Sequence, residues 1–474
     1  MVPSTLRPFL GPMLAVLTVS LVAPCAHGDG GIHTLISFNL SNGNQPSAGL
    51  VQGPDGAFYG TTQTGGSYNQ GTVFKIASNG AFTNLFSFSG ITGPYPGANP
   101  AGNLVLGVNG NFYGTTESGG ASNNGTLFEM TPTGGFTNLI SFTGTNGVYP
   151  GDYSTAGLVL GTNGSLYGTT QSGGTNDLAD GGDGTIFQLA TNGVFTSLVS
   201  FSGTNGAWLG ANPGGCLVLG TDGNLYGTTL YGGTNDQVNG GDGTVFRITS
   251  AGVFTSLFSF NTTNGANPQA GLVPGGNGSF YGTTYNGGSN ALGTVFKMTP
   301  QGSLTSLLSF NNANGANPQA GLVQGLDGDL YGTTKSGGTS NYGTVFQITP
   351  AGRFTILVSF ANTNGAYPVA GLIQGSDGNF YGTTASGGTN YAYGTVFRFT
   401  PPPLFLKQWQ TNGAFAFTWS TATGQIYQVQ FVTSLGHTNW SNLGSAIPAT
   451  NATTTAADSM GTNQQQFYRV ELEP

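Results

Sequence analysis

The sequence predicts an all-β fold, a seven-bladed β-propeller of four-stranded blades that is closed by its N-terminal strand and followed by a small C-terminal β-sandwich. Three observations predict it. The tetrapeptide YGTT occurs seven times, four short strand-like runs surround each copy, and one extra copy of the fourth run precedes the first repeat. Self-similarity at a period of about 50 residues is typical of repeat architectures and decides the fold class before any local feature does.

The repeat is defined by the YGTT tyrosines, which are 50 to 59 residues apart: Tyr59, Tyr113, Tyr167, Tyr226, Tyr281, Tyr331 and Tyr381. In the sixth repeat the four runs are residues 320–324, 329–334, 343–349 and 354–360, rich in β-branched and aromatic residues. An Asp-Gly or Asn-Gly pair separates the first two runs of every repeat, which is the strongest short signal of a β-hairpin. Each repeat is therefore predicted to be an antiparallel four-stranded sheet.

The two ends of the array are out of phase. Residues 32–38 match the fourth run but precede the first repeat, whereas the seventh repeat stops after its third run, residues 394–400. An N-terminal strand that completes the last blade would close the ring and leave no free sheet edge at the seam. A β-solenoid gains nothing from this phase shift and ranks second.

The remaining segments give the domain organisation. Residues 1–28 have the pattern of a secretory signal peptide, with Arg7 ahead of an apolar stretch and small residues at the cleavage site. That stretch is shorter than the about 20 apolar residues of a spanning helix, so we expect a secreted or cell-surface monomer without a membrane span. The propeller is assigned to residues 29–400, a proline linker to 401–403 and the β-sandwich to 404–474.

Charge and cysteine content exclude several classes of function. The chain has 9 Lys and Arg against 17 Asp and Glu, a net charge of -8, and its basic residues are scattered. A nucleic-acid partner is disfavoured, because phosphate neutralisation needs clustered basic side chains. Cys25 lies in the signal peptide, which leaves Cys216 without an internal disulfide partner.

The strings GTVF and YGTT-x-x-GG recur in all or nearly all repeats. With these strings, residues 32–400 resemble the GloVer tandem-repeat family of bacterial exported proteins. The resemblance implies tandem β repeats and export. It implies no activity and no catalytic residues.

Ligand contacts are expected on the face that carries the long loops between repeats. Those loops place Tyr95, Tyr149, Trp208 and Tyr367 at one equivalent position, among many Asn, Thr and Ser residues. Aromatic rings with uncharged amides and hydroxyls suit a polysaccharide or cell-surface glycan. The alternative is that the rings fold back onto the blades, since a buried aromatic side chain stabilises the fold more than an exposed one.

Two glycine-rich loops concentrate acidic residues in a chain that is otherwise poor in charge. They contribute the candidate calcium ligands Asp177, Asp180, Asp183, Asp236, Asn239 and Asp242. Oxygen ligands on a flexible loop are what Ca²⁺ prefers. Neither loop fits the twelve-residue calcium pattern that ends in Glu, and solvated acidic turns are the other interpretation. No other cofactor is expected.

Catalysis has few candidates, and the sequence favours a non-enzymatic protein. A glycosidase needs two carboxylates across a sugar bond, and the best available pair is Glu117, just after the second YGTT, and Asp152, in the next long loop. We therefore predict an exported binding or scaffold protein that binds glycan on its long-loop face. The alternatives are a polysaccharide-cleaving enzyme, hydrolase or lyase, on the same face and a protein-binding structural repeat.

Overall fold

The structure is a computed structural model that describes residues 31–176, 182–235, 240–276, 278–389, 393–411, 414–433, 439–459 and 466–473. Its regular elements within these ranges are β-strands, apart from one 3-10 turn at Asn362–Asn364. In the same ranges there is no helix of the length and apolar character that crossing a bilayer requires. The chain divides into two compact units, a repeat unit of residues 28–375 and 380–399 and a second unit that contains residues 400–474 and 376–379.

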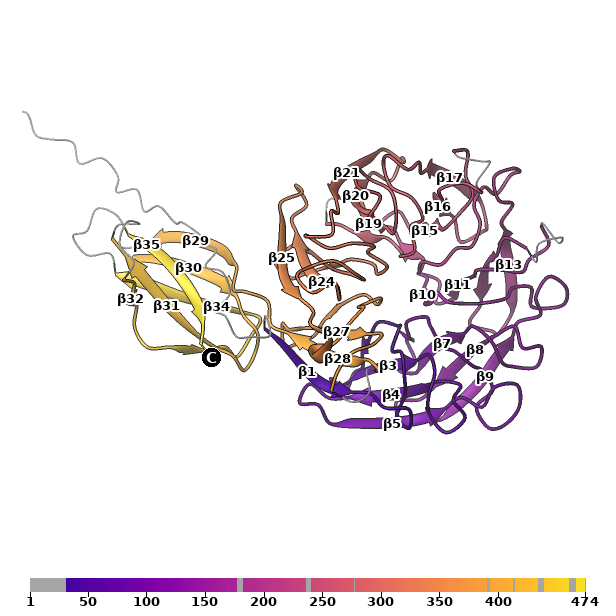
Figure 1. Ribbon diagram of the computed structural model, residues 1–474, viewed down its shortest axis with the longest axis horizontal. Coiled ribbons are helices and arrows are strands. Elements are labelled where there is room, and N and C mark those ends of the chain that lie inside the picture. Colours follow the sequence, from indigo (N-terminus) through magenta and orange to yellow (C-terminus); the bar gives the residue numbers. More distant parts are fainter. Residues whose placement is uncertain are drawn as a thin grey trace, which may run out of the picture. The chain divides into compact units, whose positions relative to one another are not determined.

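The repeat unit consists of four-stranded antiparallel sheets in tandem, as predicted (Figure 1). Sheets 1 to 3 are β2 (Val51–Gln52), β3 (Phe58–Thr62), β4 (Thr72–Ile76) and β5 (Phe82–Ser87); β6 (Val105–Leu106), β7 (Phe112–Thr116), β8 (Thr126–Met130) and β9 (Phe136–Ser141); and β10 (Val159–Leu160), β11 (Leu166–Thr170), β12 (Thr185–Leu189) and β13 (Phe195–Ser200). Sheets 4 to 6 are β14 (Val218–Leu219), β15 (Leu225–Thr229), β16 (Thr244–Ile248) and β17 (Phe254–Ser259); β18 (Val273–Pro274), β19 (Phe280–Thr284), β20 (Thr294–Met298) and β21 (Leu304–Ser309); and β22 (Val323–Gln324), β23 (Leu330–Thr334), β24 (Thr344–Ile348) and β25 (Phe354–Ser359).

Sheet 7 combines the two ends of the array. Its order is β1 (Ile32–Ser37), β28 (Thr395–Phe399), β27 (Phe380–Thr384) and β26 (Ile373–Gln374). β1 pairs antiparallel with β28, with Ile32 opposite Phe399 and Ser37 opposite Thr395. The out-of-phase N-terminal run is therefore the fourth strand of sheet 7. In Figure 1 the fourth strands, such as β13 and β21, lie at the rim, and the short first strands face the middle.

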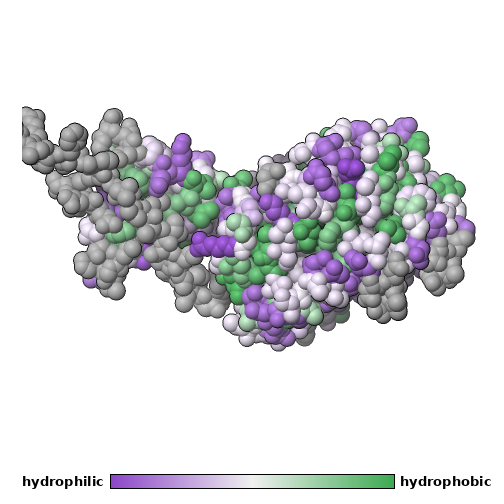
Figure 2. Space-filling view, turned by 90° about the horizontal axis from the view of Figure 1, so that it is seen from above, coloured by the Kyte–Doolittle hydropathy of each residue, from purple (hydrophilic) through white to green (hydrophobic). Residues whose placement is uncertain are grey.

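The hydrophobic core lies between neighbouring sheets. Each of seven clusters joins the YGTT tyrosine and the third residue of the GTVF string of one sheet, which is Leu127 or Ile186 in two repeats and valine in the others, to at least one phenylalanine of the next. One of them joins Tyr381 and Val396 of sheet 7 to Phe58 and Phe74 of sheet 1, together with Phe38. Figure 2 shows hydrophobic and hydrophilic residues interspersed over the coloured part of the visible surface. In β5, Phe82 is half-buried and Thr83 is exposed.

The glycine and the last threonine of the YGTT string each have a structural explanation. Its last threonine shares a hydrogen bond with the first residue of the third strand, as between Thr62 and Thr72 at 2.8 Å, and the six other repeats have the same buried pair. Its glycine lies under aromatic and aliphatic side chains, because a Cβ atom at Gly332 would come within 2.6 Å of Phe346 and 2.7 Å of Leu322. The repeated string is therefore a packing motif.

The second unit contains two small sheets. One is formed by β29 (Phe405–Thr411), β30 (Ala414–Ser420) and β34 (Thr453–Ser459), and the other by β31 (Ile426–Val432), β32 (Ser441–Asn442), β33 (Ile447–Pro448) and β35 (Phe467–Leu472). Phe417 and Trp419 of the first sheet share a core with Tyr427, Val429 and Tyr468 of the second. Two sheets that enclose one core form a sandwich.

Candidate functional site: a polar cavity lined by all seven sheets

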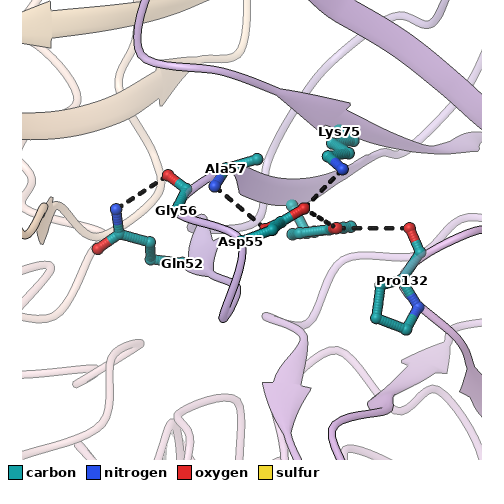
Figure 3. Close-up of polar contacts among 7 residues, drawn as sticks. Gln52, Asp55, Gly56, Ala57, Lys75 and Pro132 are labelled. Atoms are coloured by element: carbon teal, nitrogen blue, oxygen red, sulfur yellow. Dashed lines mark hydrogen bonds and ion pairs between the residues drawn. The ribbon is translucent and has the colours of Figure 1, made fainter.

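The tight turns between first and second strands are built for stability. Asp55 accepts hydrogen bonds from the Tyr59 hydroxyl at 2.9 Å and the Ala57 backbone N–H at 3.2 Å, and it pairs with Lys75 at 2.6 Å (Figure 3). Burial raises the pKa of Asp55. The hydrogen bonds from Lys75, Tyr59 and Ala57 and the charge of Lys75 together lower it by more, so the pKa of Asp55 lies below its usual value. Equivalent tyrosine contacts join Asn109 to Tyr113, Asn163 to Tyr167, Asp222 to Tyr226 and Asp327 to Tyr331.

The repeat unit contains a cavity of about 790 Å³ that receives lining residues from every sheet. Its wall is formed where the loop between repeats runs into the short first strand, and by the residue that follows each YGTT string. Backbones approach closely there, because a Cβ atom at Gly271 would lie 2.3 Å from the carbonyl oxygen of Cys216. The small residues at the start of the first strands therefore let the sheets converge around the cavity.

Neutral hydrogen-bonding groups dominate the lining. Its amides include Gln45, Gln63, Asn103, Gln171, Gln269 and Gln319, and its hydroxyls include Ser47, Thr155 and Ser386. The Asn103 side chain accepts a hydrogen bond from the Gly49 N–H at 2.6 Å. The buried oxygens Oε1 of Gln319 and Oγ1 of Thr155 have no hydrogen-bond partner among the described residues.

Cys216 also faces this cavity. Its sulfur accepts a hydrogen bond from the Gly157 N–H at 3.1 Å, and burial raises the pKa of the thiol. A raised pKa keeps the thiol protonated at neutral pH, which disfavours a nucleophilic cysteine.

The position directly after YGTT carries the charged groups of the lining. Six of its seven residues line the cavity: Gln63, Glu117, Gln171, Leu230, Lys335 and Ala385. Glu117 accepts a hydrogen bond from the Gln63 amide at 3.1 Å. Burial raises the pKa of Glu117 above its ordinary value, and the Gln63 hydrogen bond opposes that rise in part.

The structure places the predicted sugar-binding aromatics at two different positions, so the single equivalent ring is wrong. Tyr367 lines the cavity and has a left-handed φ of 56°. The residues that share its left-handed conformation and its place in the loop are Gln45, Asn99, Tyr153, Asn212, Asn267 and Asn317. Tyr95, Tyr149 and Trp208 instead lie in extra hairpins, each closed by a glycine pair such as Gly90 and Gly97. Tyr95, Tyr149 and Tyr367 are each followed by proline, which made two different loop positions look equivalent in the sequence.

Two of these hairpin aromatics fold back onto the sheets. Tyr95 stacks on Phe86 with ring centroids 4.9 Å apart, and Tyr149 meets the edge of Phe195 at 5.4 Å. Trp208 remains 38% exposed. Tyr95 and Tyr149 therefore contribute to packing, as the alternative interpretation had it, and Trp208 is the hairpin ring that solvent reaches most.

The candidate carboxylate pair is divided between two environments. Glu117 is in the cavity lining, whereas Asp152 is not. The Asp152 carboxylate accepts a hydrogen bond from the Tyr153 N–H at 2.9 Å. Burial raises the pKa of Asp152 to about 6, with the Tyr153 hydrogen bond acting in the opposite direction.

Of the six proposed calcium ligands, the structure describes only Asp183 and Asp242. Asp177, Asp180, Asp236 and Asn239 lie outside the described residues. Asp183 is half-buried and Asp242 is buried. Within the described ranges, His, Cys, Asp and Glu side chains form no cluster of three that could hold a metal ion. Calcium binding by these loops stays a prediction.

Sequence reasoning missed the cavity residues Gln63, Gln171 and Lys335, although a signal for them was present. Of the residues that follow YGTT, the sequence marked only Glu117, as a candidate acid, although most of the others also line the cavity. The variation of the residue after YGTT between repeats, from Gln to Glu, Leu, Tyr, Lys and Ala, contrasts with the fixed string before it. Variable positions next to invariant packing positions are where a repeat scaffold carries its specificity.

Comparison with solved structures returned distant likenesses. A Bacteroides uniformis protein described as a 6-phosphogluconolactonase has a TM-score of 0.46 at 13% identity, over 86% of this chain and 99% of that one. A PL25 ulvan lyase gives 0.43 at 11% identity, over 76% and 94%. Puromycin hydrolase gives 0.46 at 12% identity, over 82% and 62%. A search of curated protein sequences found no match.

The family comparison is more informative. The model of the Gloeobacter/Verrucomicrobia repeat matches residues 25–178 and 230–440, which is more than half of the chain. The match confirms the resemblance that the YGTT and GTVF strings indicated. The chain therefore belongs to the Gloeobacter/Verrucomicrobia repeat family.

Proposed function

We propose that this chain is an exported glycan-binding protein whose seven sheets are the blades of a closed propeller, with the binding site in the central cavity. The pairing of β1 with β28 and the core cluster shared by sheets 7 and 1 support the closed ring. The signal-peptide pattern of residues 1–28 supports secretion or display at the cell surface. A monomer fits a ring that leaves no sheet edge at its seam.

The observation that carries the proposal is the chemistry of the lining. A cavity of about 790 Å³ falls within the range of about 300–1,000 Å³ that is usual for small-molecule sites. Amides and hydroxyls can both donate and accept hydrogen bonds, which matches the hydroxyl groups of a sugar. Tyr367 adds an aromatic face to this lining, against which the C–H face of a sugar ring can pack.

The lining argues against the two-carboxylate glycoside hydrolase among the enzymatic alternatives. Glycoside hydrolysis uses two carboxyl groups about 5–9.5 Å apart, and Glu117 is the one acid among the described lining residues. A protein ligand remains the other alternative to a glycan, and it would engage the exposed hairpins rather than the cavity.

The test is an affinity measurement with a panel of soluble polysaccharides and oligosaccharides, read together with new reducing ends. The informative variant is Tyr367→Asn, because Asn occupies the equivalent position in four other repeats and the fold should tolerate it. The matched control is Tyr153→Asn, the same substitution at an equivalent position outside the lining.

We expect retention of a glycan by the wild-type chain without new reducing ends, weaker retention by Tyr367→Asn and unchanged retention by Tyr153→Asn. Equal retention by both variants would place the site elsewhere. New reducing ends would establish an enzyme instead.

A further inference from the structure

The cavity lining contains a single cationic side chain, Lys335, directly after β23 of sheet 6. It is half-buried, and its ammonium group lies over the ring of Tyr285 at 5.8 Å from the centroid. The ion pairs within the described ranges are Lys75 with Asp55 and Arg469 with Glu471, so Lys335 has no carboxylate partner there. Because no carboxylate of the described residues pairs with it, the ammonium group of Lys335 can form an ion pair with an anionic ligand.

The acid of the same lining does not neutralise Lys335. Glu117 follows β7 of sheet 2, which is four sheets before sheet 6 along the chain, and its carboxylate accepts a hydrogen bond from the Gln63 amide at 3.1 Å. The rest of the lining supplies neutral amides and hydroxyls, small and aliphatic groups, the Tyr367 ring and the Cys216 thiol. The positive charge is therefore the one feature of the lining that would favour a negatively charged ligand over a neutral one.

The other repeats carry no basic residue at the position of Lys335. Lys335 is the one basic residue among the seven that follow YGTT, and the corresponding lining residues include Gln63 in sheet 1 and Gln171 in sheet 3. The protein as a whole carries a net charge of -8, which repels anions in general. A lone, half-buried cation inside an acidic protein acts on a ligand that enters the cavity rather than on anions at the surface.

We propose that the cavity selects an anionic saccharide, one that bears carboxylate or sulfate groups, and that Lys335 is the residue that binds the anion. This inference rests on the proposed function, since it names the class of glycan for the same cavity. Amide groups such as those of Gln63 and Gln171 would hold the sugar hydroxyls, and Lys335 would pair with the acidic group.

The chain offers a closely matched pair of variants. Lys335→Gln introduces the residue found at the same position in sheets 1 and 3. Lys297→Gln is the control, because Lys297 also lies over a tyrosine ring, that of Tyr281 at 5.8 Å, but outside the lining. Gln occupies the position of Lys297 in sheets 3 and 6. Both variants remove one positive charge above a tyrosine, and only one of them changes the cavity.

The experiment measures dissociation constants of the mature full-length chain for three sets of probes. These are galacturonic acid oligosaccharides, sulfated galactan oligosaccharides, and neutral sets made by methyl esterification or desulfation of the same molecules. We expect one anionic set to bind more tightly than its neutral counterpart, with an affinity that falls as salt increases. Lys335→Gln should weaken that binding at least about tenfold, or about 1.4 kcal/mol, while Lys297→Gln leaves it unchanged.

The outcomes separate the two proposals. Preference for the carboxylate or the sulfate set, lost in Lys335→Gln, supports the inference and identifies the acidic group. Equal binding of charged and neutral sets, unchanged in Lys335→Gln, overturns the inference and leaves glycan binding in place. Equal losses in both lysine variants also overturn it, because the effect would then be one of net charge. If no set binds, the proposed function fails and the inference fails with it.

Discussion

Gln63 donates a hydrogen bond to Glu117 at 3.1 Å and thereby links the residues that follow YGTT in two neighbouring repeats. Both side chains line the cavity. The contact holds a carboxyl group in a half-buried position, where its charged form loses solvation by water. The pair makes the ionisation of Glu117 a property of the cavity and not of the repeat alone.

Replacing Glu117 by Gln should remove a pH-dependent destabilisation. Burial raises the pKa of Glu117 in the folded chain, so the folded state holds its proton more tightly than the unfolded state does. Stability is then lost as the pH rises from the unfolded value of 4.5 through the folded pKa. We expect Glu117→Gln to match the wild-type melting temperature at pH 4 and to exceed it at pH 7.

The same variant bears on catalysis. If any polysaccharide-cleaving activity exists in this cavity, Glu117 is the described acid that could supply it, and Glu117→Gln should abolish new reducing ends. Turnover that survives the substitution would exclude Glu117 as its acid. A melting temperature that follows the wild type at every pH would show that the carboxyl group titrates normally.

Asp152 should give a similar dependence with a defined window. Its pKa is raised by burial to about 6 from 3.8, so the folded chain loses stability between those two values as the pH increases. Asp152→Asn keeps an oxygen that can accept the Tyr153 N–H and removes the charge. The melting-temperature difference between variant and wild type should grow from pH 4 to pH 6 and then level off. A difference that is constant across this range would contradict the raised pKa.

The repeat architecture could be predicted from the sequence because the same strand and turn signals recur in every repeat. Strand positions, the hairpin turns and the pairing of residues 32–38 with the last repeat follow from alternation, Asp-Gly and Asn-Gly pairs and the phase of the array. The strictly repeated YGTT tyrosine is a packing residue in the structure, and Tyr331 is 1% exposed. Packing constraints that act on every repeat leave a periodic trace.

The site was harder to predict because its residues differ from one repeat to the next, so the repeat pattern does not mark them. Tyr367 and Tyr95 share a Tyr-Pro dipeptide, yet one takes a left-handed loop position at the cavity and the other stacks on Phe86. That difference depends on an inserted hairpin, whose length varies between repeats and which no local propensity specifies. Lys335 lies at a position that changes from repeat to repeat, so no repeated pattern marks it.

The glycine of YGTT should be intolerant of any side chain. A Cβ atom at Gly332 would lie 2.6 Å from Phe346 and 2.7 Å from Leu322, and the core around it is closely packed. We expect Gly332→Ala to cost about 1–3 kcal/mol of unfolding free energy, as overpacking does. Gly276→Ala is the control, because a Cβ atom there meets no neighbour within 4 Å. Denaturant unfolding of both variants tests this, and equal midpoints would refute the packing explanation.

The seam between the two ends of the array should be as strong as any junction inside it. Phe38, from the N-terminal segment, is fully buried and packs against Phe74 at 5.3 Å and Phe82 at 5.9 Å. Phe310 makes the same contacts within the array, with Phe346 at 5.5 Å and Phe354 at 6.1 Å. Both residues therefore bury a whole aromatic ring between two sheets.

Phe38→Ala and Phe310→Ala should each cost about 3–5 kcal/mol, the usual range for a buried phenylalanine. Unfolding free energies from denaturant titration, with slopes compared to verify a common transition, provide the measurement. If the ring is closed in solution, the two losses agree within about 1 kcal/mol, since the ring leaves a similar cavity at either position. A loss at Phe38 that is several-fold smaller would mean that the N-terminal strand detaches and that the ring opens at this seam.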